Sequence, residues 1–286
     1  MPSYFVDSHV HFWDPSVLKY PWLDGLPNLN APFLPADYPP FNSRASSAAI
    51  FVEANVAPEM ADREVAWVSQ LATCEPRIRG IVGFVDLLAD RSRPAALARL
   101  RATRRVVGVR HNIQGQPSGF AVQATFVRGV QEAGQLGLVF DLCVTANQLQ
   151  EATELVRQCP NTTFVLDHCG KPAIRDGHFA SWAEDLRRLA QYENVSCKLS
   201  GLLTEAEAGQ CTFEVLQPYA THALACFGPS RLLYGSDWPV CTLRGGESQW
   251  WALMDQFTAT FPSNARDDFY AGNAARIYGI TFDPND

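Results

Sequence analysis

Two histidines stand one residue apart in the segment Asp7–His11, near the start of the 286-residue chain. Alternate side chains of a β-strand point to the same face, so we expect His9 and His11 on one face and Val6 and Val10 on the other. Two neutral imidazoles on a rigid strand form half of a site for a divalent metal ion. The same pair is also compatible with two histidines held by hydrogen bonds inside a protein core.

Three other apolar runs end in residues that could act together with this pair. His168 ends one run, Asp237 follows another, and Glu53 follows a third. A histidine in such a place can bind metal or donate to a developing oxyanion, and a carboxylate can take a proton from water. We therefore count His9, His11, His168, Asp237 and Glu53 as candidate metal ligands. A buried salt bridge is the alternative role for Glu53.

The elements that must position these residues alternate along the chain. Eight apolar runs are typical of strands: 5–12, 48–54, 78–87, 106–113, 138–144, 163–168, 195–199 and 232–236. Helix-like segments accompany them: 59–74, 94–104, 126–135, 147–158, 179–192, 212–227, 247–261 and 264–278. Strands that alternate with helices pair in parallel, and eight such units in under 300 residues favour an α/β fold, the closed (β/α)8 or TIM barrel.

We treat residues 1–286 as one barrel domain that contains a single long insertion. The segment 13–47 carries seven prolines and shows little periodicity. It leaves the barrel after the first strand, at the rim where TIM-barrel active sites lie, so we expect it to form a pocket wall or lid. A solvent-exposed irregular loop is the alternative.

Composition excludes several classes of function. With 47% hydrophobic and 19% charged residues, the chain is not intrinsically disordered. A net charge of −7 offers no basic face for nucleic acid or for an anionic membrane, so a small molecule is the expected partner. Neither a membrane-spanning run nor an export signal is visible, and we expect a cytoplasmic protein. The eight cysteines form no CxxC pair, so we expect free thiols.

Seven short motifs extend the pattern beyond single residues. They are FVDSHVHFW (5–13), YPWL (20–23), GVRH (108–111), LDHCGKP (166–172), CKLSGL (197–202), YGSDWPV (234–240) and GNAARIYG (272–279). Together they resemble the amidohydrolase superfamily, specifically amidohydrolase family 2, and within it the branch of sugar lactonases. The resemblance covers nearly the whole chain.

The resemblance implies a hydrolase that opens a sugar (aldono) lactone in carbohydrate catabolism. The implied substrates are L-fuconolactone or a related L-galactono- or D-arabinono-lactone. Asp237 would activate water, while His9, His11 and His168 would polarise the carbonyl group, and the sugar lactone would be the small-molecule partner.

The resemblance also implies one divalent metal ion, most simply zinc. Binuclear relatives place a bridging lysine or carboxylate and a histidine on the fourth and fifth strands, where this chain has Val109–His111 and Phe140–Leu142. A second metal site is therefore not expected. Some relatives are understood to work without metal, with imidazole N–H groups forming the oxyanion site, and this alternative stays open.

Six residues are candidates for binding the substrate. Side chains near the strand ends offer charge, amide groups or an apolar floor for a sugar ring: Arg110, His111, Gln114, Trp22, Trp238 and Lys198. Arg110 and Lys198 are also suited to structural ion pairs, and Trp22 is also suited to anchoring the insertion.

A metal-dependent decarboxylase, or a hydrolase of a small aromatic or dicarboxylic acid or pyrone-type lactone, is the second hypothesis. A dicarboxylate would need paired cations beside Arg110, whereas a neutral lactone needs mainly hydroxyl partners. A non-catalytic sugar- or metal-binding barrel is a third. The preferred sugar, the 1,4- or 1,5-lactone form, and the choice between monomer and homodimer are not decided by the sequence.

Overall fold

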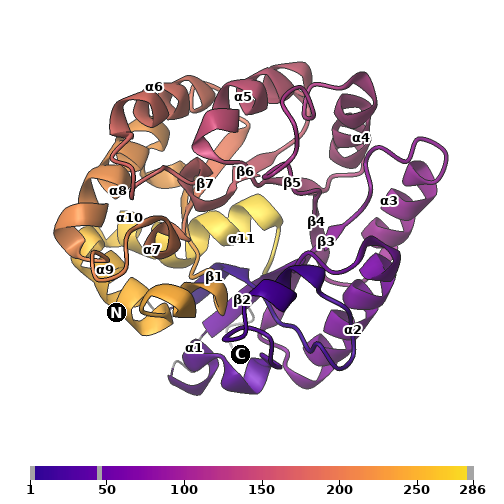
Figure 1. Cartoon of the computed structure of the whole chain (residues 1–286), viewed down its shortest axis with the longest axis horizontal. Helices are drawn as coiled ribbons and strands as arrows, with labels where there is room; N and C mark the ends of the chain where they lie inside the picture. The colour runs from indigo at the N-terminus through magenta and orange to yellow at the C-terminus, as the bar shows by residue number, and fades with distance from the viewer. Residues whose placement is uncertain (1–3, 44–46, 282–286) are drawn as a thin grey trace.

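The computed structural model describes residues 4–43 and 47–281 and contains one sheet of eight parallel strands in sequence order (Figure 1). The strands are β1 (Phe5–Val10), β2 (Ser47–Val52), β3 (Ile78–Phe84), β4 (Val106–Arg110), β5 (Val139–Leu142), β6 (Phe164–Leu166), β7 (Val195–Leu199) and β8 (Leu232–Tyr234). A parallel bridge between Val10 and Trp238 joins the first strand to the segment after the last. The predicted TIM barrel is confirmed.

Helices surround the strands, as Figure 1 shows. They are α2 (Ala61–Cys74), α3 (Arg93–Ala102), α4 (Ala124–Gln135), α5 (Leu149–Gln158), α6 (Phe179–Leu189), α8 (Phe213–Phe227) and α9 (Glu247–Phe257). In α4, Phe126, Val130 and Ala133 are buried, the spacing of one apolar helix face. Among the described residues, no helix has the length and apolar character needed to cross a membrane.

Four shorter helices complete the chain: α1 (Pro39–Ser43), α7 (Leu202–Glu205), α10 (Ser263–Asp267) and α11 (Asn273–Tyr278). The segment 264–278, predicted as one helix, is α10 and α11 joined by a π-helical turn at Asp268–Gly272.

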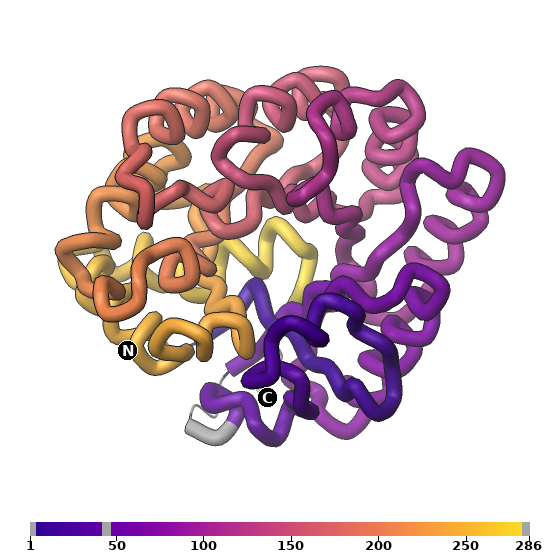
Figure 2. Tube along the Cα trace, viewed as in Figure 1, coloured from indigo at the N-terminus to yellow at the C-terminus, as the bar shows by residue number. Residues whose placement is uncertain are grey.

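One end of the barrel is closed by apolar side chains. Alternate residues of β2 (Ala48, Ile50 and Val52) form a cluster with Ala274 and Tyr278 of α11. In Figures 1 and 2 the yellow segment that contains α11 lies inside the outline of the ring. Because α11 packs against these interior side chains, the polar residues that follow the strands are left at the other end.

The first strand is irregular, and this corrects one expectation. The register between β1 and β2 shifts between Asp7 and Val10. Val6 packs in the interior cluster with α11, whereas Val10 packs in the larger cluster with the helices. The prediction that these valines share a face is wrong, because a strand irregularity between them changes the alternation.

The insertion after β1 is held by its own aromatic cluster. An antiparallel bridge joins Trp13 to Phe33, and the Trp13 indole donates hydrogen bonds to the carbonyls of Leu29 and Ala31. Trp13, Leu23 and Leu29 pack with residues just after β2. The Trp22 indole adds a 2.7 Å hydrogen bond to the carbonyl of Ala54. These contacts fix the insertion beside the end of β2.

Candidate active site

Three strand ends bring four side chains together. His9 and His11 come from the end of β1, His168 follows β6, and Asp237 follows β8. The backbone of His168 and of Asp237 is left-handed, with φ of 53° and 60°. Few residues other than glycine adopt this conformation, and such backbone strain is concentrated at functional sites. It turns both side chains toward the two histidines of β1.

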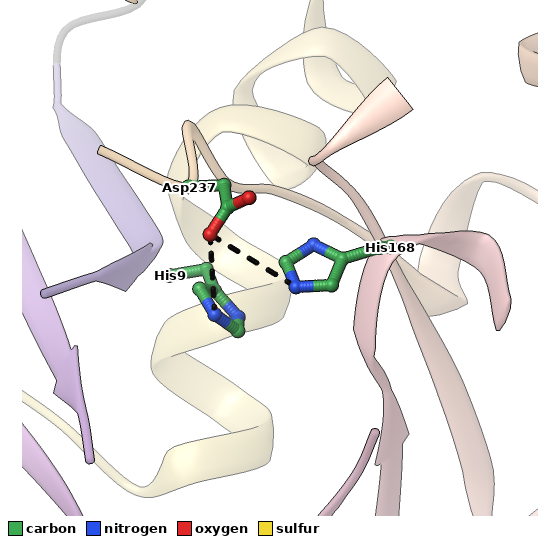
Figure 3. Close-up of side chains that lie close together, drawn as sticks. All are labelled: His9, His168 and Asp237. Carbon is green, nitrogen blue, oxygen red and sulfur yellow. Dashed lines mark ion pairs between the residues drawn. The ribbon is translucent and has the colours of Figure 1, made fainter. Parts of the chain in front are cut away.

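Four polar atoms converge at the centre of this group. The Asp237 Oδ1 atom lies 3.8 Å from His9 Nε2, 3.4 Å from His11 Nε2 and 4.0 Å from His168 Nε2. The two Nε2 atoms of His9 and His11 are 3.2 Å apart. Figure 3 shows His9 and His168 both directed at the Asp237 carboxylate.

The opposite nitrogen of each histidine is held by another element. The Nδ1 atom of His11 lies 2.7 Å from the carbonyl of Val52, and that of His168 lies 2.9 Å from Ser200 Oγ. The Nδ1 atom of His9 lies 3.1 Å from a carboxylate oxygen of Asp167. A carbonyl can only accept, so Nδ1 of His11 carries a proton, and the Asp167 carboxylate favours a proton on Nδ1 of His9. In that tautomer Nε2 of His9 presents a lone pair to the centre of the group.

This arrangement fits one divalent metal ion. In a tetrahedral zinc site with bonds of about 2.0–2.2 Å, ligand atoms lie about 3.3–3.6 Å apart. Four of the separations among these atoms, 3.2–4.0 Å, lie on either side of that spacing, so modest side-chain movement would bring the atoms to it. His9, His168 and Asp237 form a buried group able to hold a metal, and a cation would satisfy the facing lone pairs of His9 and His11 at once.

Burial sets the charges of this group. Desolvation lowers the pKa of His9 and of His168 well below the usual value for histidine, so both rings are neutral. Burial alone would raise the pKa of Asp237, but His168, His11 and Lys171 outweigh it and hold the pKa of this carboxyl below its usual value. Neutral imidazoles and an ionised carboxylate are the forms that bind a metal.

The family model for amidohydrolases matches residues 6–280. The chain belongs to the amidohydrolase family. It is 34% identical to an L-fucono-1,5-lactonase of Burkholderia multivorans, over 96% of each chain. It is 30% identical to an L-fucono-1,5-lactonase of Burkholderia ambifaria, over 97% of this chain and 96% of the relative. The structure of a Burkholderia multivorans amidohydrolase with bound zinc superposes with a TM-score of 0.88, at 33% identity, covering 98% of this chain and 100% of that one.

Beneath the four converging residues, this amidohydrolase has a layer of paired charges. Arg110 Nε lies 2.6 Å from Glu53 Oε1, and Arg110 Nη1 lies 3.2 Å from Asp167 Oδ2. The Lys198 ammonium lies 2.5 Å from Asp141 and 3.0 Å from Asp167. All five side chains are buried. Glu53 is therefore not among the converging metal ligands; it forms the salt bridge that the sequence left as its alternative role.

Lys198 does not line the cavity either. Its side chain is fully buried, and its ammonium contacts Asp141, Asp167 and, at 3.2 Å, the Nδ1 atom of His9. Burial would lower the pKa of Lys198, but the two carboxylates outweigh it and raise that pKa, so the residue is a permanent cation under the site. It acts on substrate only through the groups it positions.

A cavity of about 180 Å³ opens above the converging residues. This is smaller than the clefts of about 300–1,000 Å³ that bind drug-sized ligands, and it suits a single small ring. Its wall includes Trp22, Arg110 and Gln114 from the predicted binding set, together with Asn55, Asn112, Cys143 and Lys171. The amide groups and the indole are a suitable lining for a hydroxylated ring.

Two predicted binding residues lie elsewhere. The His111 ring faces an adjoining hollow, where it accepts a hydrogen bond from the Leu87 N–H and packs against Phe120 and Phe126. The Trp238 side chain is 3% exposed and packs among aromatic rings of the core instead of forming a floor for substrate. His111 directly follows β4 and Trp238 lies four residues after β8, but a position near a strand end does not fix which way the side chain points.

Several residues of the site were not predicted. Asp167 and Ser200 hold the histidines, while Asn55, Asn112 and Lys171 line the cavity. Asp167 directly precedes His168 in the sequence, and an acidic residue beside a candidate ligand was the available signal for an orienting partner. Gly201 is also required, because a Cβ atom there would lie 2.5 Å from the Nδ1 atom of His168.

Proposed function

We propose that this amidohydrolase hydrolyses a sugar lactone to the free aldonic acid, with L-fucono-1,5-lactone as the first candidate substrate. The observation that carries the proposal is the convergence of three histidine Nε2 atoms on an ionised carboxylate under a small amide-lined cavity. Relatives at 34% and 30% identity that align over nearly their whole length are L-fucono-1,5-lactonases.

Asp237 is the proton carrier in this proposal. A water oxygen attacks the lactone carbonyl carbon as Asp237 takes one proton from that water. When the bond between the carbonyl carbon and the ring oxygen breaks, Asp237 returns the proton to the departing oxygen. One carboxylate can serve both steps because it is ionised at the start and again at the end.

His9, His11, His168 and Asp237 would hold one divalent ion, with zinc favoured by the nitrogen-rich donor set. If the ion kept a further position open beyond these protein ligands, it would supply Lewis acidity toward a carbonyl oxygen and would lower the pKa of a water ligand to about 7. The protein itself orients the imidazoles through Val52, Asp167 and Ser200 and keeps the rings neutral by burial.

Recognition of the sugar rests on uncharged polar groups. Asn55, Asn112 and Gln114 line the cavity and can both donate to and accept from ring hydroxyls. The Trp22 indole N–H is already used by the Ala54 carbonyl, so its ring serves as an apolar wall. Discrimination among sugar configurations is expected from the amides, since the wrong isomer leaves an amide group in the closed complex without its hydroxyl partner.

The second hypothesis, a dicarboxylate or aromatic acid as substrate, needs paired cations beside Arg110. The guanidinium of Arg110 is already engaged by Glu53 and Asp167. Lys171 is therefore left alone in the wall as a cation for an incoming anion. One available side-chain cation among the described residues of this wall, whether or not a metal ion is bound, favours a neutral lactone over a substrate with two carboxylates.

Acid release from a panel of sugar lactones tests the proposal: L-fucono, L-galactono, D-arabino, L-rhamnono and D-xylono forms. We expect turnover of one stereochemical group after spontaneous opening is subtracted, and a fall of about 10²–10⁴-fold in Asp237→Asn. The matched control is Asp62→Asn, a carboxylate of α2 whose side chain is 75% exposed and does not line the cavity.

Two results would contradict the proposal. Turnover by Asp237→Asn close to that of Asp62→Asn would remove Asp237 from the reaction. Failure of the folded wild-type protein to open any lactone of the panel would shift the assignment to the decarboxylase hypothesis.

A further inference from the structure

The two basic side chains in the cavity wall differ in their partners. Every nitrogen of the Arg110 guanidinium is engaged: Nε and Nη1 with Glu53 and Asp167, and Nη2 with the Glu53 carbonyl. Within residues 4–43 and 47–281, the side chain of Lys171 forms neither an ion pair nor a hydrogen bond. Its ammonium is the cation of this wall that remains available to a ligand.

The backbone holds Lys171 in the same wall as His168. Four successive residues, His168 to Lys171, have positive φ values of 53°, 52°, 69° and 46°. The Lys171 N–H donates a 2.9 Å hydrogen bond to the His168 carbonyl, which closes a tight turn. Strained backbone of this kind persists where the surrounding structure imposes it, commonly at ligand sites. Here it presents an imidazole and an ammonium, three residues apart, to one cavity.

The proposed reaction creates an anion in this cavity. The lactone is neutral, but ring opening releases a carboxylic acid that ionises to a carboxylate beside the carboxylate of Asp237. Two anions at close range in a partly buried site repel each other strongly unless cations lie beside them. The proposed metal ion would be shared with Asp237, so a side-chain cation in the wall is the second source of positive charge for the product. Arg110 cannot turn to the product without breaking its own buried pairs.

We propose that Lys171 binds the carboxylate of the ring-opened aldonate. This inference rests on the proposed function and adds a preference for product over substrate. The ammonium of Lys171 contacts the carboxylate of the anionic product, and the neutral lactone has no carboxylate to make this contact. Product inhibition therefore weakens with rising ionic strength, while recognition of the lactone does not. A lactone that carries a separate carboxylate is bound through the same ammonium.

Isothermal titration calorimetry with L-fuconate and with the neutral alditol L-fucitol tests this contact, because the two ligands differ at the terminal carboxylate. We expect Lys171→Met to weaken L-fuconate binding at least about 10-fold, to leave L-fucitol binding within about 2-fold, and to abolish the salt dependence of L-fuconate binding. Lys171→Arg should retain most of the affinity because it keeps the charge.

The matched control is Arg175→Met in the same loop. Arg175 is half exposed, pairs with Glu207 at 3.0 Å and lies outside the wall of this cavity, so its loss should leave L-fuconate binding unchanged. An unchanged affinity for L-fuconate in Lys171→Met would overturn the inference. Equal losses for L-fuconate and L-fucitol would also overturn it, because they would show that Lys171 only shapes the cavity.

Calorimetry separates this inference from the proposed function. If no lactone is turned over, the proposed function fails, yet the comparison of L-fuconate with L-fucitol still reports whether Lys171 binds a carboxylate. If lactones are opened but Lys171→Met binds L-fuconate as the wild-type protein does, the function stands and the inference fails.

Discussion

Two groups of buried polar residues lie one above the other in the barrel, and their charges are arranged in opposite ways. In the upper group, His9, His11, His168 and Asp237 direct atoms at one another without forming a closed set of hydrogen bonds. In the lower layer, Glu53, Arg110, Asp141, Asp167 and Lys198 pair every charge with an opposite one. The upper group therefore has polar atoms available for a ligand, whereas the charges of the lower layer are already neutralised by one another.

Asp167 and His9 link the two levels. One carboxylate oxygen of Asp167 meets His9 Nδ1 at 3.1 Å and the Lys198 ammonium at 3.0 Å, while the other meets Arg110 at 3.2 Å. Burial would raise the pKa of Asp167, but Lys198, His9 and Arg110 outweigh it and hold that pKa well below its usual value. The paired layer thus supplies a fixed anion that orients one imidazole of the upper group. Changes in the upper group should affect activity, and changes in the lower layer should affect stability.

The largest expected effect is on the upper group and follows treatment that would remove the proposed metal ion. Prolonged dialysis against a chelator should lower kcat at least about 100-fold, because the converging nitrogen lone pairs lose the cation that they share. Addition of one equivalent of zinc should restore activity, as measured by acid release and metal analysis. Full activity in protein shown to be metal-free would mean that the imidazoles act alone.

In the lower layer, Arg110→Met should destabilise the protein by about 3–5 kcal/mol, because it leaves the buried carboxylate of Glu53 without its cation and removes one of the two cations beside Asp167. Chemical denaturation measures the change. The control is Arg99→Met, whose pair with Asp62 is exposed and should contribute no more than about 0.5 kcal/mol. A change below about 1 kcal/mol for Arg110→Met would show that the layer is not a stabilising network.

The same contrast explains what the sequence could predict. The barrel was predictable because apolar runs and helix-like segments alternate eight times, and His9, His11, His168 and Asp237 were predictable because their residue types at strand ends are chemically distinctive. The pairs of the lower layer were not predictable. Arg110 meets Glu53 and Asp167 across 57 residues of sequence in each direction, and only the strand order around the barrel makes them neighbours.

The positions of Trp22, Trp238 and Val6 show the same limit of prediction from the sequence. Trp22 reaches the cavity because the insertion folds back to Ala54, whereas Trp238 is covered by Phe12, Phe33 and Tyr38. Val6 changes face at a strand irregularity that no residue pattern indicates. Side-chain direction at these positions depends on tertiary packing. The two-residue alternation of a β-strand, which is all that the sequence shows, does not predict that packing.

A smaller effect is expected from the residue that holds His168. Ser200→Ala removes the hydroxyl 2.9 Å from His168 Nδ1, and loss of such an outer partner typically weakens metal binding about 10–100-fold. Competition with a chromophoric chelator measures the zinc affinity. Ser196→Ala, on the same segment of chain but within β7, is the matched control and should bind zinc as the wild-type protein does. Equal affinities in the two variants would show that Ser200 does not orient the ligand.

A pH-dependent effect concerns a carboxyl group beside the paired layer that forms no ion pair within the described part of the chain. Glu64 of α2 is fully buried and accepts a hydrogen bond from the Ala54 N–H, and burial together with Glu53 raises its pKa to about 8. The unfolded chain loses this proton near pH 4.5, the folded protein only near pH 8. Stability from this group is therefore complete below pH 4.5 and falls as pH rises toward 8, by at most about 1.4 kcal/mol per unit.

Glu64→Gln keeps the acceptor for Ala54 but cannot ionise, so the decline should disappear. We expect the free energy of unfolding of the variant, relative to wild type, to increase steadily between pH 5.5 and 7.5 in chemical denaturation series. Parallel pH profiles for the two proteins would mean that Glu64 ionises as readily in the folded protein as in the unfolded chain. In that case a buried carboxylate beside the paired layer would be stable without a cation. The pairing of every charge in the lower layer would then not be needed for stability, and the proposed difference between the two groups would fail.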